Sequence, residues 1–268
     1  MMKIGFIGLG NMGGSLARLV AQDERFRSEL LLANRSRDKA EKIAAELGGQ
    51  PVSNAEVFSQ AEVIFLGIKP AQFTDLLAEY QEILEKRESI LLVSMAAGLS
   101  LELLEKLTPS HHRWIRIMPN TPVAVGEGVI TYSLSQQANQ VDEDLLRDLL
   151  SSAGFLLRLE EKQLDAATAL AGCGPAFVYL FIEALADAGV RAGLSRDISL
   201  ELANQTLLGA AKLSQDSGQH PAQLKDQVCS PAGSTIAGIA SLEENAFRGT
   251  VMDAVQAAYE RTQELGKK

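Results

Sequence analysis

The sequence predicts an α/β protein of two parts, in which a doubly wound, mainly parallel sheet precedes an all-helical domain. Two observations support this. From residue 1 to about 160, short continuous apolar runs alternate with amphipathic segments, as in βαβ units. After Glu160 the strand patterns stop, and alanine- and leucine-rich segments with helical spacing follow. We therefore expect domains at residues 1–160 and 161–268.

The first part contains seven apolar runs that we interpret as strands. They lie at Lys3–Ile7, Glu29–Ala33, Val63–Gly67, Ile90–Ser94, Arg113–Ile117, Gly128–Tyr132 and residues 154–159. Helical patterns occupy residues 12–22, 37–47, 71–86, 100–107 and 141–152, and some open on a capping residue such as Ser36 or Ser100. Continuous apolar strands separated by helices are typical of a parallel sheet that is covered on both faces.

The second part is predicted to be helical throughout. The helical segments are residues 163–171, 175–192, 195–216, 221–229, 234–243 and 246–264. Prolines 175, 221 and 231 stand where proline favours a helix start or the turn before it. Pro175–Leu185 is apolar on more than one face, with Glu183 as its single charge. Because about 100 residues provide few internal partners for such a helix, we expect a subunit interface.

The composition excludes several classes of protein. The net charge of −9 argues against a nucleic-acid partner, and the two cysteines form no disulfide framework and fit a reducing compartment. We interpret Met1–Gly10 as a buried strand rather than a signal peptide, and we expect no apolar stretch long enough to span a membrane. The three histidines lack ligand spacing, so no metal is expected. These observations predict a cytoplasmic protein.

A glycine-rich turn follows the first strand and opens the first helix. Its sequence, Gly8-Leu-Gly10-Asn11-Met12-Gly13, is the G-x-G-x-x-G pattern in a strand–turn–helix context. Glycines there permit the tight turn and let the backbone approach a pyrophosphate at the helix N-terminus. The pattern therefore indicates a Rossmann-type dinucleotide-binding domain at residues 1–160.

The end of the second strand indicates which dinucleotide is bound. NAD-binding proteins usually carry Asp or Glu there to hold the ribose 2′-hydroxyl. This strand instead ends in Asn34-Arg35-Ser36, and an arginine between two neutral hydrogen-bonding residues suits a 2′-phosphate. NADP(H) is thus favoured, with NAD(H) possible. The alternative is that Arg35 is a solvated surface charge.

Three further strand ends are candidates for the same edge of the sheet. Lys69-Pro70 follows the strand at 63–67, and Lys69 could approach the ribose or phosphate or be an ordinary surface lysine. Ser94–Gly98 includes Ala96 and Ala97, small residues that a nicotinamide ring could approach. Met118–Pro122 includes Asn120 and is either a site or a rigid turn. Ligands of open α/β sheets bind at this carboxyl edge.

A small, hydroxyl-rich segment in the second part is the candidate substrate site. Ser230-Pro-Ala-Gly233-Ser234-Thr235 leads into a helix, whose free N–H groups and dipole suit a carboxylate. The alternative is an ordinary N-cap loop. Since no His or Lys base stands out, the pattern fits hydride delivery to a carbon that is already electrophilic, such as that of a protonated cyclic imine.

Several motifs together resemble pyrroline-5-carboxylate reductase. The Leu-Lys-Asp-x-Val-x-Ser-Pro-x-Gly-x-Thr order lies intact within Pro221–Glu243, and it is highly specific. Similar segments cover nearly the whole chain, among them Gly5-Phe-Ile-Gly-x-Gly, Val-Ile-Phe-Leu-Gly-Ile-Lys-Pro, Ala96-Ala97-Gly98, Met118-Pro-Asn-Thr-Pro, Gly172-Cys-Gly-Pro-Ala176 and Ala186-Asp-Ala-Gly. The resemblance implies NAD(P)H-dependent reduction of 1-pyrroline-5-carboxylate to L-proline, the last step of proline biosynthesis.

The resemblance also implies roles for individual residues. Ser230 and the backbone at Gly233 and Ser234 would hold the substrate carboxylate, and Thr235, the catalytic candidate, would meet the ring nitrogen. Positions matching cofactor contacts are Asn34, Arg35, Ser36, Asn54 and Lys69. Residues 161–268 would form an interlocked homodimer, with five dimers often closing into a decamer. Ala232 and Cys229 depart from glycine and serine, which are common in the family at these positions.

Two other functions are compatible with parts of the sequence. Ile4–Gly13 also resembles β-hydroxyacid dehydrogenases, but these carry a catalytic lysine in the first long helix after the dinucleotide domain, and Pro175–Ala192 has none. A non-catalytic NADPH sensor would have no use for an intact Ser230–Thr235 loop.

Overall fold

The computed structural model describes residues 2–265, which form two compact units. The first contains residues 2–173 together with 258–265, and the second contains residues 174–257. The predicted domain division at residue 160 stays a prediction. The chain beyond residue 160 remains in the first unit because its side chains and carbonyls bond to the sheet, notably Glu161, Asp165 and Ala171.

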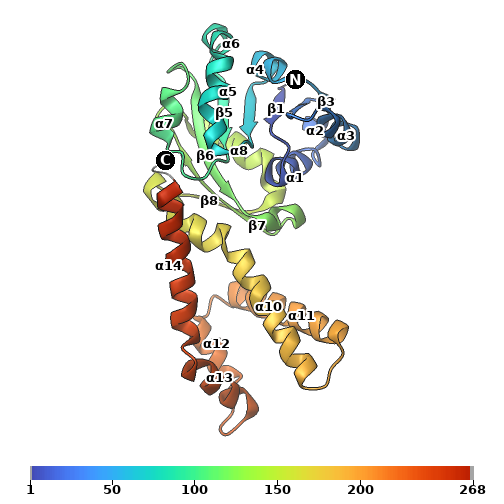
Figure 1. Ribbon diagram of the computed structural model, residues 1–268, viewed down its shortest axis with the longest axis vertical. Coiled ribbons are helices and arrows are strands. Elements are labelled where there is room, and N and C mark those ends of the chain that lie inside the picture. Colours follow the sequence, from blue (N-terminus) through green and yellow to red (C-terminus); the bar gives the residue numbers. More distant parts are fainter. Residues whose placement is uncertain (1, 266–268) are drawn as a thin grey trace. The chain divides into compact units, whose positions relative to one another are not determined.

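The first unit is built on one eight-stranded sheet with the order β3-β2-β1-β4-β5-β6-β7-β8 (Figure 1). The strands are β1 (Ile4–Ile7), β2 (Leu30–Ala33), β3 (Gln50–Pro51), β4 (Val63–Leu66), β5 (Leu91–Ser94), β6 (Arg113–Pro119), β7 (Gly128–Leu134) and β8 (Gly154–Arg158). All neighbours pair in parallel except β6 and β7, which are antiparallel. The prediction of a doubly wound, mainly parallel sheet is confirmed.

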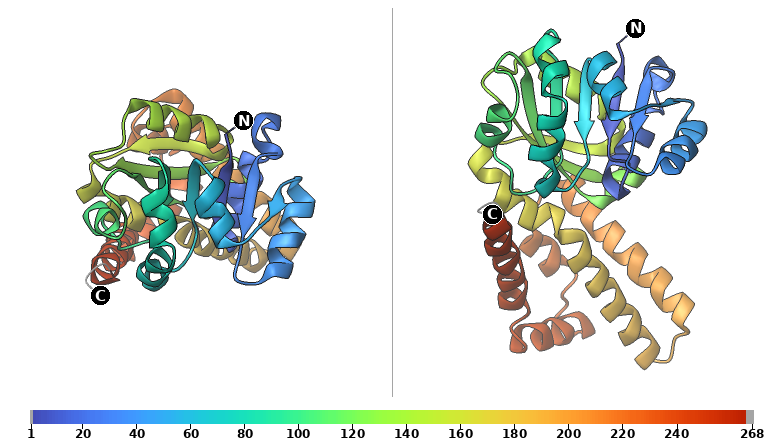
Figure 2. Two further views of the ribbon diagram at one scale, coloured as in Figure 1. Left: turned by 90° about the horizontal axis from the view of Figure 1, so that it is seen from above. Right: turned by 45° about the horizontal axis from the view of Figure 1, so that its top comes forward.

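Two layers of helices cover opposite faces of this sheet (Figure 2). One layer consists of α1 (Asn11–Val20), α2 (Glu24–Arg27), α3 (Arg37–Leu47) and α8 (Gln140–Leu149). The other consists of α4 (Asn54–Gln60), α5 (Phe73–Glu79), α6 (Gln81–Lys86) and α7 (Leu101–Lys106). Alternate residues of a strand enter opposite cores, as Leu31 and Leu32 do, which is why the strands are apolar without interruption.

The structure corrects one predicted helix and adds three short elements. The helix expected at residues 71–86 is a 3₁₀ turn at Pro70–Gln72 followed by α5 and α6, which are separated at Tyr80. The Tyr80 ring stacks on Phe58 with the ring centres 5.2 Å apart, so tertiary packing accompanies the break. The short elements α2, β3 and α4 were not predicted, although Ser53 and Glu56 form a capping box that signals the start of α4.

The second part of the chain is all-helical, as predicted. The 3₁₀ turns η2 (Thr121–Val125) and η3 (Ser151–Ala153) still belong to the part before residue 160. The second part begins with the 3₁₀ turn η4 (Glu161–Gln163). Its helices are α9 (Leu164–Ala167), the π-helix η5 (Thr168–Gly172), α10 (Gly174–Arg191), α11 (Arg196–Ser217), α12 (Pro221–Gln227), α13 (Ser234–Glu244) and α14 (Phe247–Leu265). α10 and α11 pack side by side as a helical hairpin (Figure 2).

The second unit buries little of its own apolar surface. Of the described residues 174–257, only Ala186, Ser199 and Ala203 are buried. Large side chains on its helices stay exposed, for example Leu180 at 68% and Met252 at 66%. A unit of this size without a larger core needs another partner for its apolar surface.

The expectation that no apolar stretch is long enough to span a membrane is wrong by the criteria of length and composition. The helical run Glu161–Arg191 comprises 31 residues and is apolar enough to cross a bilayer by those two criteria. The run meets these two criteria because η4, α9, η5 and α10 follow one another with few charged residues. A helix that is apolar on several faces is equally typical of a buried subunit interface, so this finding alone assigns no membrane location.

The buried His112 predicts a loss of stability in mild acid. Its Nδ1 accepts from the Ile90 N–H at 3.3 Å and its Nε2 contacts the Leu84 carbonyl at 3.0 Å, which fixes a neutral ring. Burial, with smaller repulsion from His111, lowers the pKa of His112 to about 4. The unfolded chain therefore takes up the proton first, and stability present above pH 6.5 is lost as the pH falls towards 4, by about 3 kcal/mol in total.

Urea unfolding of the protein and of His112→Asn at pH 7, 6 and 5 measures this effect. The difference in free energy of unfolding between the two proteins should shrink as the pH falls. Substitution of the adjacent, exposed His111 by Asn is the control and should keep most of the wild-type slope. A pH-independent difference would contradict the assignment.

Candidate active site

The glycine turn between β1 and α1 leaves no room for side chains at two positions. A Cβ on Gly13 would lie 2.1 Å from the Gly8 carbonyl oxygen, and one on Gly8 would lie 2.6 Å from the Gly67 carbonyl oxygen. Gly8 also has φ +91°, in the left-handed region. A Cβ on Gly10 would meet nothing within 4 Å. The backbone in front of Gly10 is thus open to a ligand.

The N-terminus of α1 is available for an anion. Gly10 is its N-cap residue, and no side chain caps the helix. Asn11 and Met12 form its first turn, directly at this open backbone. Free N–H groups at a helix N-terminus, together with the helix dipole, bind phosphate groups. The turn therefore fits the pyrophosphate of a dinucleotide.

The segment after β2 is tied to the glycine turn by Asn34. The Leu9 N–H donates to Asn34 Oδ1 at 3.0 Å, and Asn34 Nδ2 donates to the Ser36 carbonyl at 3.2 Å. Arg35 and Ser36 next to it are exposed, and their side chains have no partner within the described residues. An unpaired guanidinium and a free hydroxyl beside the start of α3 suit a 2′-phosphate.

The other cofactor candidates lie at the same edge of the sheet because the strands β1 to β6 are all parallel. Lys69 and Pro70 follow β4 and are exposed, while Asn54 is the first residue of α4 and is half-buried. Ala96 and Ala97 follow β5, and Ala96 is buried. Parallel topology thus gathers residues that follow six strands, β1 to β6, as expected for a ligand site of an open α/β sheet.

Asn120, at the end of β6, has internal partners. Its Oδ1 accepts from the Val129 N–H at 2.8 Å, and its Nδ2 donates to the Ala171 carbonyl at 3.0 Å. The side chain is 7% exposed. Its contacts within the protein hold the end of β6 to β7 and to η5. A cofactor contact of Asn120 stays a prediction.

The candidate substrate loop lies in the second unit, before α13. A turn closes it, since the Gly233 N–H donates to the Ser230 carbonyl at 3.1 Å. Gly233 is the N-cap residue of α13, and no side chain caps this helix. The hydroxyls of Ser230, Ser234 and Thr235 are exposed and have no hydrogen-bond partner within the described residues. Uncapped N–H groups beside free hydroxyls favour a carboxylate site over an ordinary capped loop.

Two positions of this loop are sterically demanding. A Cβ on Gly233 would lie 2.4 Å from Ser230 Oγ, so only glycine keeps that hydroxyl in place. Ala232 has φ +57°, a left-handed conformation that is unfavourable for an L residue by about 1–2 kcal/mol. Glycine would adopt this conformation without strain.

Sequence reasoning did not identify the buried cation Arg116 of β6, which pairs with Glu161 and Asp165. An arginine inside the apolar run Trp114–Met118 was the available signal, since a charged residue is rarely buried without a partner. Among residues 2–265 no group of three or more potential metal ligands occurs.

Comparison with known proteins agrees with this arrangement. The family model for pyrroline-5-carboxylate reductase dimerisation matches residues 161–265, and that for F420-dependent NADP oxidoreductases matches residues 3–98. The chain is 45% identical to pyrroline-5-carboxylate reductase of Glycine max, covering 98% of this chain and 95% of that protein. Identity to the reductase of Synechocystis sp. is 40%, over 100% and 99%.

Solved structures show the same similarity. Pyrroline carboxylate reductase of Plasmodium falciparum with NADP bound superposes with a TM-score of 0.88 at 38% identity, covering 99% of this chain and 98% of that one. The pyrroline-5-carboxylate reductase of Coxiella burnetii gives 0.90 at 31% identity, covering 100% and 99%.

The sheet, the glycine turn and the helical dimerisation domain define an oxidoreductase that uses NADP(H). At the identity and coverage found, the chain belongs to the pyrroline-5-carboxylate reductase family.

Arg35→Ala tests the cofactor assignment. If Arg35 pairs with the 2′-phosphate, the substitution should weaken NADPH binding by roughly 10- to 100-fold, the value of a charge-assisted contact of about 1.5–3 kcal/mol. NADH binding should change little. Calorimetric titration of both cofactors measures the contrast. Arg37→Ala is the matched control, because Arg37 already pairs with Glu41 at 2.9 Å. Equal losses for NADPH and NADH would assign Arg35 to the fold or the pyrophosphate.

Proposed function

We propose that this enzyme reduces the C=N bond of 1-pyrroline-5-carboxylate to give L-proline, the last step of proline biosynthesis. NADPH supplies the hydride when it is bound. Family membership over nearly the full length supports this reaction. The observation that carries it in this structure is the Ser230–Thr235 loop, with an uncapped helix N-terminus and three unpartnered hydroxyls.

In this proposal the loop binds the carboxylate of the substrate. Ser230 Oγ and the Ser234 backbone N–H donate to its oxygens beside Gly233, whose own N–H donates to the Ser230 carbonyl. The positive end of the α13 dipole aids binding. The protein has a net charge of −9, so these local donors, rather than its overall field, hold the anion. A five-membered ring held by its carboxylate has its nitrogen on the adjacent carbon, which leaves Thr235 to meet that nitrogen.

Thr235 orients the ring through its hydroxyl. The substrate carbon is electrophilic because the imine nitrogen is protonated, and reduction turns that nitrogen into a basic amine. No strong general acid is needed, and a hydroxyl that accepts from or donates to the nitrogen is sufficient to align the ring. This matches a site in which sequence analysis found no His or Lys base.

We also propose that the enzyme is a cytoplasmic homodimer, with five dimers forming a decamer. The dimerisation model matches residues 161–265, the part that leaves its apolar side chains exposed in a single chain. In a dimer these side chains would be covered. The apolar run Glu161–Arg191 would then lie against protein rather than lipid.

The two alternative functions lack comparable support. A β-hydroxyacid dehydrogenase would need a lysine in the first long helix after the sheet, and α10 contains none. A non-catalytic NADPH sensor gives no reason for the free hydroxyls before α13. NADPH oxidation assayed with pyrroline-5-carboxylate separates these functions from the proposed one.

Thr235→Ala tests the proposed role of the hydroxyl. Loss of orientation and one polar contact should lower kcat/KM for the imine by about 10- to 1000-fold, while NADPH affinity and assembly persist. Thr235→Ser should recover much of the rate. Ser241→Ala, which removes an exposed hydroxyl further along α13, is the control and should be nearly neutral. Unchanged turnover with a lower Tm would show that the Thr235 hydroxyl serves only the helix.

Light scattering tests the assembly. The protein should remain at least dimeric at low micromolar concentration, well above the 28.8 kDa of one chain. Leu180→Glu on α10 should cause dissociation, because it places a charge on an exposed apolar position of the dimerisation domain. Val141→Glu is the control, since Val141 is 72% exposed but belongs to α8 in the first unit. A stable, active wild-type monomer would overturn the proposed assembly.

A further inference from the structure

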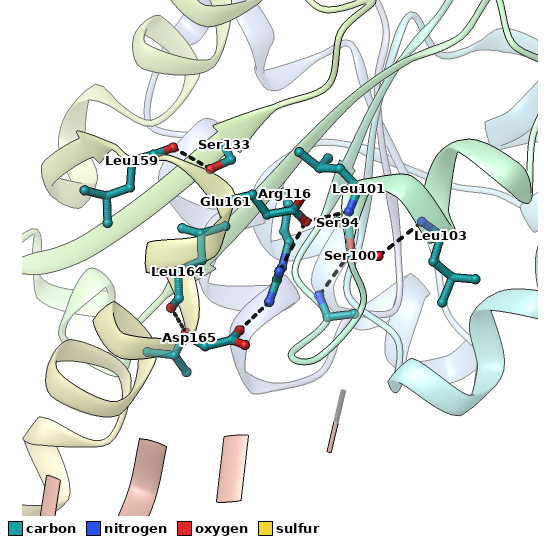
Figure 3. Close-up of polar contacts among 12 residues, drawn as sticks. Ser94, Ser100, Leu101, Leu103, Arg116, Ser133, Leu159, Glu161, Leu164 and Asp165 are labelled. Carbon is teal, nitrogen blue, oxygen red and sulfur yellow. Dashed lines mark hydrogen bonds and ion pairs between the residues drawn. The ribbon is translucent and has the colours of Figure 1, made fainter. Parts of the chain in front are cut away.

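Arg116 is a buried cation held by two carboxylates. Its side chain is 5% exposed, with Nη1 3.3 Å from Glu161 Oε1 and Nη2 3.0 Å from Asp165 Oδ1 (Figure 3). Its Nε has no partner within the described residues. An ion pair at a buried site is weak support for stability, because desolvation offsets the attraction. The arrangement therefore calls for a role beyond holding the fold together.

Glu161 makes a second contact, which Asp165 does not. The Glu161 Oε1 atom that faces Arg116 also accepts from the Leu101 N–H at 2.6 Å. Leu101 is the first residue of α7, and the Ser100 hydroxyl before it accepts from the Leu103 N–H at 3.2 Å. Figure 3 shows Glu161 between Arg116 and the start of α7. The buried guanidinium thus fixes the carboxylate that anchors this helix start.

The segment between β5 and α7 is consequently held at both ends. At one end Ser94 lies beside Arg116 in the sheet register, and its Oγ accepts from the Ala96 N–H at 3.2 Å. At the other end Glu161 holds Leu101. The loop between them, residues 95–100, contains Ala96 and Ala97, the candidate contacts for the nicotinamide ring. Gly98 turns the loop with φ +79°.

We propose that Glu161, itself fixed by Arg116, is a positioning residue that holds loop 95–100 against the nicotinamide end of the cofactor. The inference rests on the proposed function, because it assumes that Ala96 and Ala97 face that ring. Misplacement of a reactant by about 1 Å can lower the rate by about 100-fold, so the position of the loop should affect turnover most.

A pair of variants separates positioning from stability. Glu161→Ala and Asp165→Ala each remove one carboxylate from the same guanidinium, and the two carboxylates are similarly exposed, at 32% and 29%. Only Glu161→Ala also releases the Leu101 N–H. Each variant leaves Arg116 with one carboxylate partner instead of two, so the two variants should lose similar amounts of thermal stability. They should differ in every property that depends on loop 95–100.

The kinetic expectation is a split between the two variants. Glu161→Ala should lower kcat by about 5- to 30-fold with a smaller change in KM for the imine, whereas Asp165→Ala should stay within about 2-fold of wild type. Glu161→Gln should recover most of the rate, because its amide oxygen can still accept from the Leu101 N–H.

Binding provides a second readout that does not depend on turnover. Calorimetry should show that Glu161→Ala weakens NADPH by about 3- to 10-fold while leaving 2′-phospho-ADP-ribose, which lacks nicotinamide, unchanged. Asp165→Ala should leave both unchanged. Equal kinetic and binding losses in the two variants, or losses in neither, would overturn the positioning role. A wild-type protein that does not reduce the imine would overturn the proposed function instead, and the binding contrast would still decide this inference.

Discussion

No side chain fits where the ends of β1 and β4 meet the start of α1. The Gly8 carbonyl lies so close to Gly13 and Gly67 that a Cβ at either position would approach it to 2.1 and 2.6 Å. Backbone contact at this point sets how near α1 comes to the edge of the sheet. At the same turn α1 begins without a side-chain cap, because its N-cap residue is Gly10, and the Leu9 N–H donates to Asn34 Oδ1.

A helix that begins at a glycine without a side-chain cap occurs a second time in the chain, among different neighbouring residues. α13 also begins at a glycine N-cap without a side-chain cap, but free hydroxyls rather than further glycines stand beside it. A pyrophosphate needs close backbone approach, whereas a small carboxylate next to an imine needs one or two additional polar atoms. The difference in residues between the two helix starts thus corresponds to the difference between the two proposed ligands.

The sequence predicted most of this arrangement because its signals are local. Continuous apolar runs located all the strands except the two-residue β3, and the glycine turn and Arg35 follow from adjacent residues. The break at Tyr80 was missed because it accompanies stacking on Phe58, which is distant in sequence. The pairing of Arg116 with Glu161, 45 residues away, could not be predicted for the same reason. Only the unusual placement of a charge in β6 pointed to it.

The contacts of β6 also explain a difference between two divisions of the chain. The apolar strand pattern ends near residue 160, whereas the first compact unit extends to Cys173. Asn120 directly follows β6 and is itself extended, so it lies on the same face as Arg116, four residues before it. Arg116 holds the start of the segment 161–172 through Glu161 and Asp165, and Asn120 holds its end through the Ala171 carbonyl. The apolar strand pattern ends with β8, but these polar contacts keep the next residues on the sheet until Cys173. The first residues that the dimerisation model covers therefore belong physically to the cofactor half, and through Glu161 they bear on the loop proposed to face the nicotinamide.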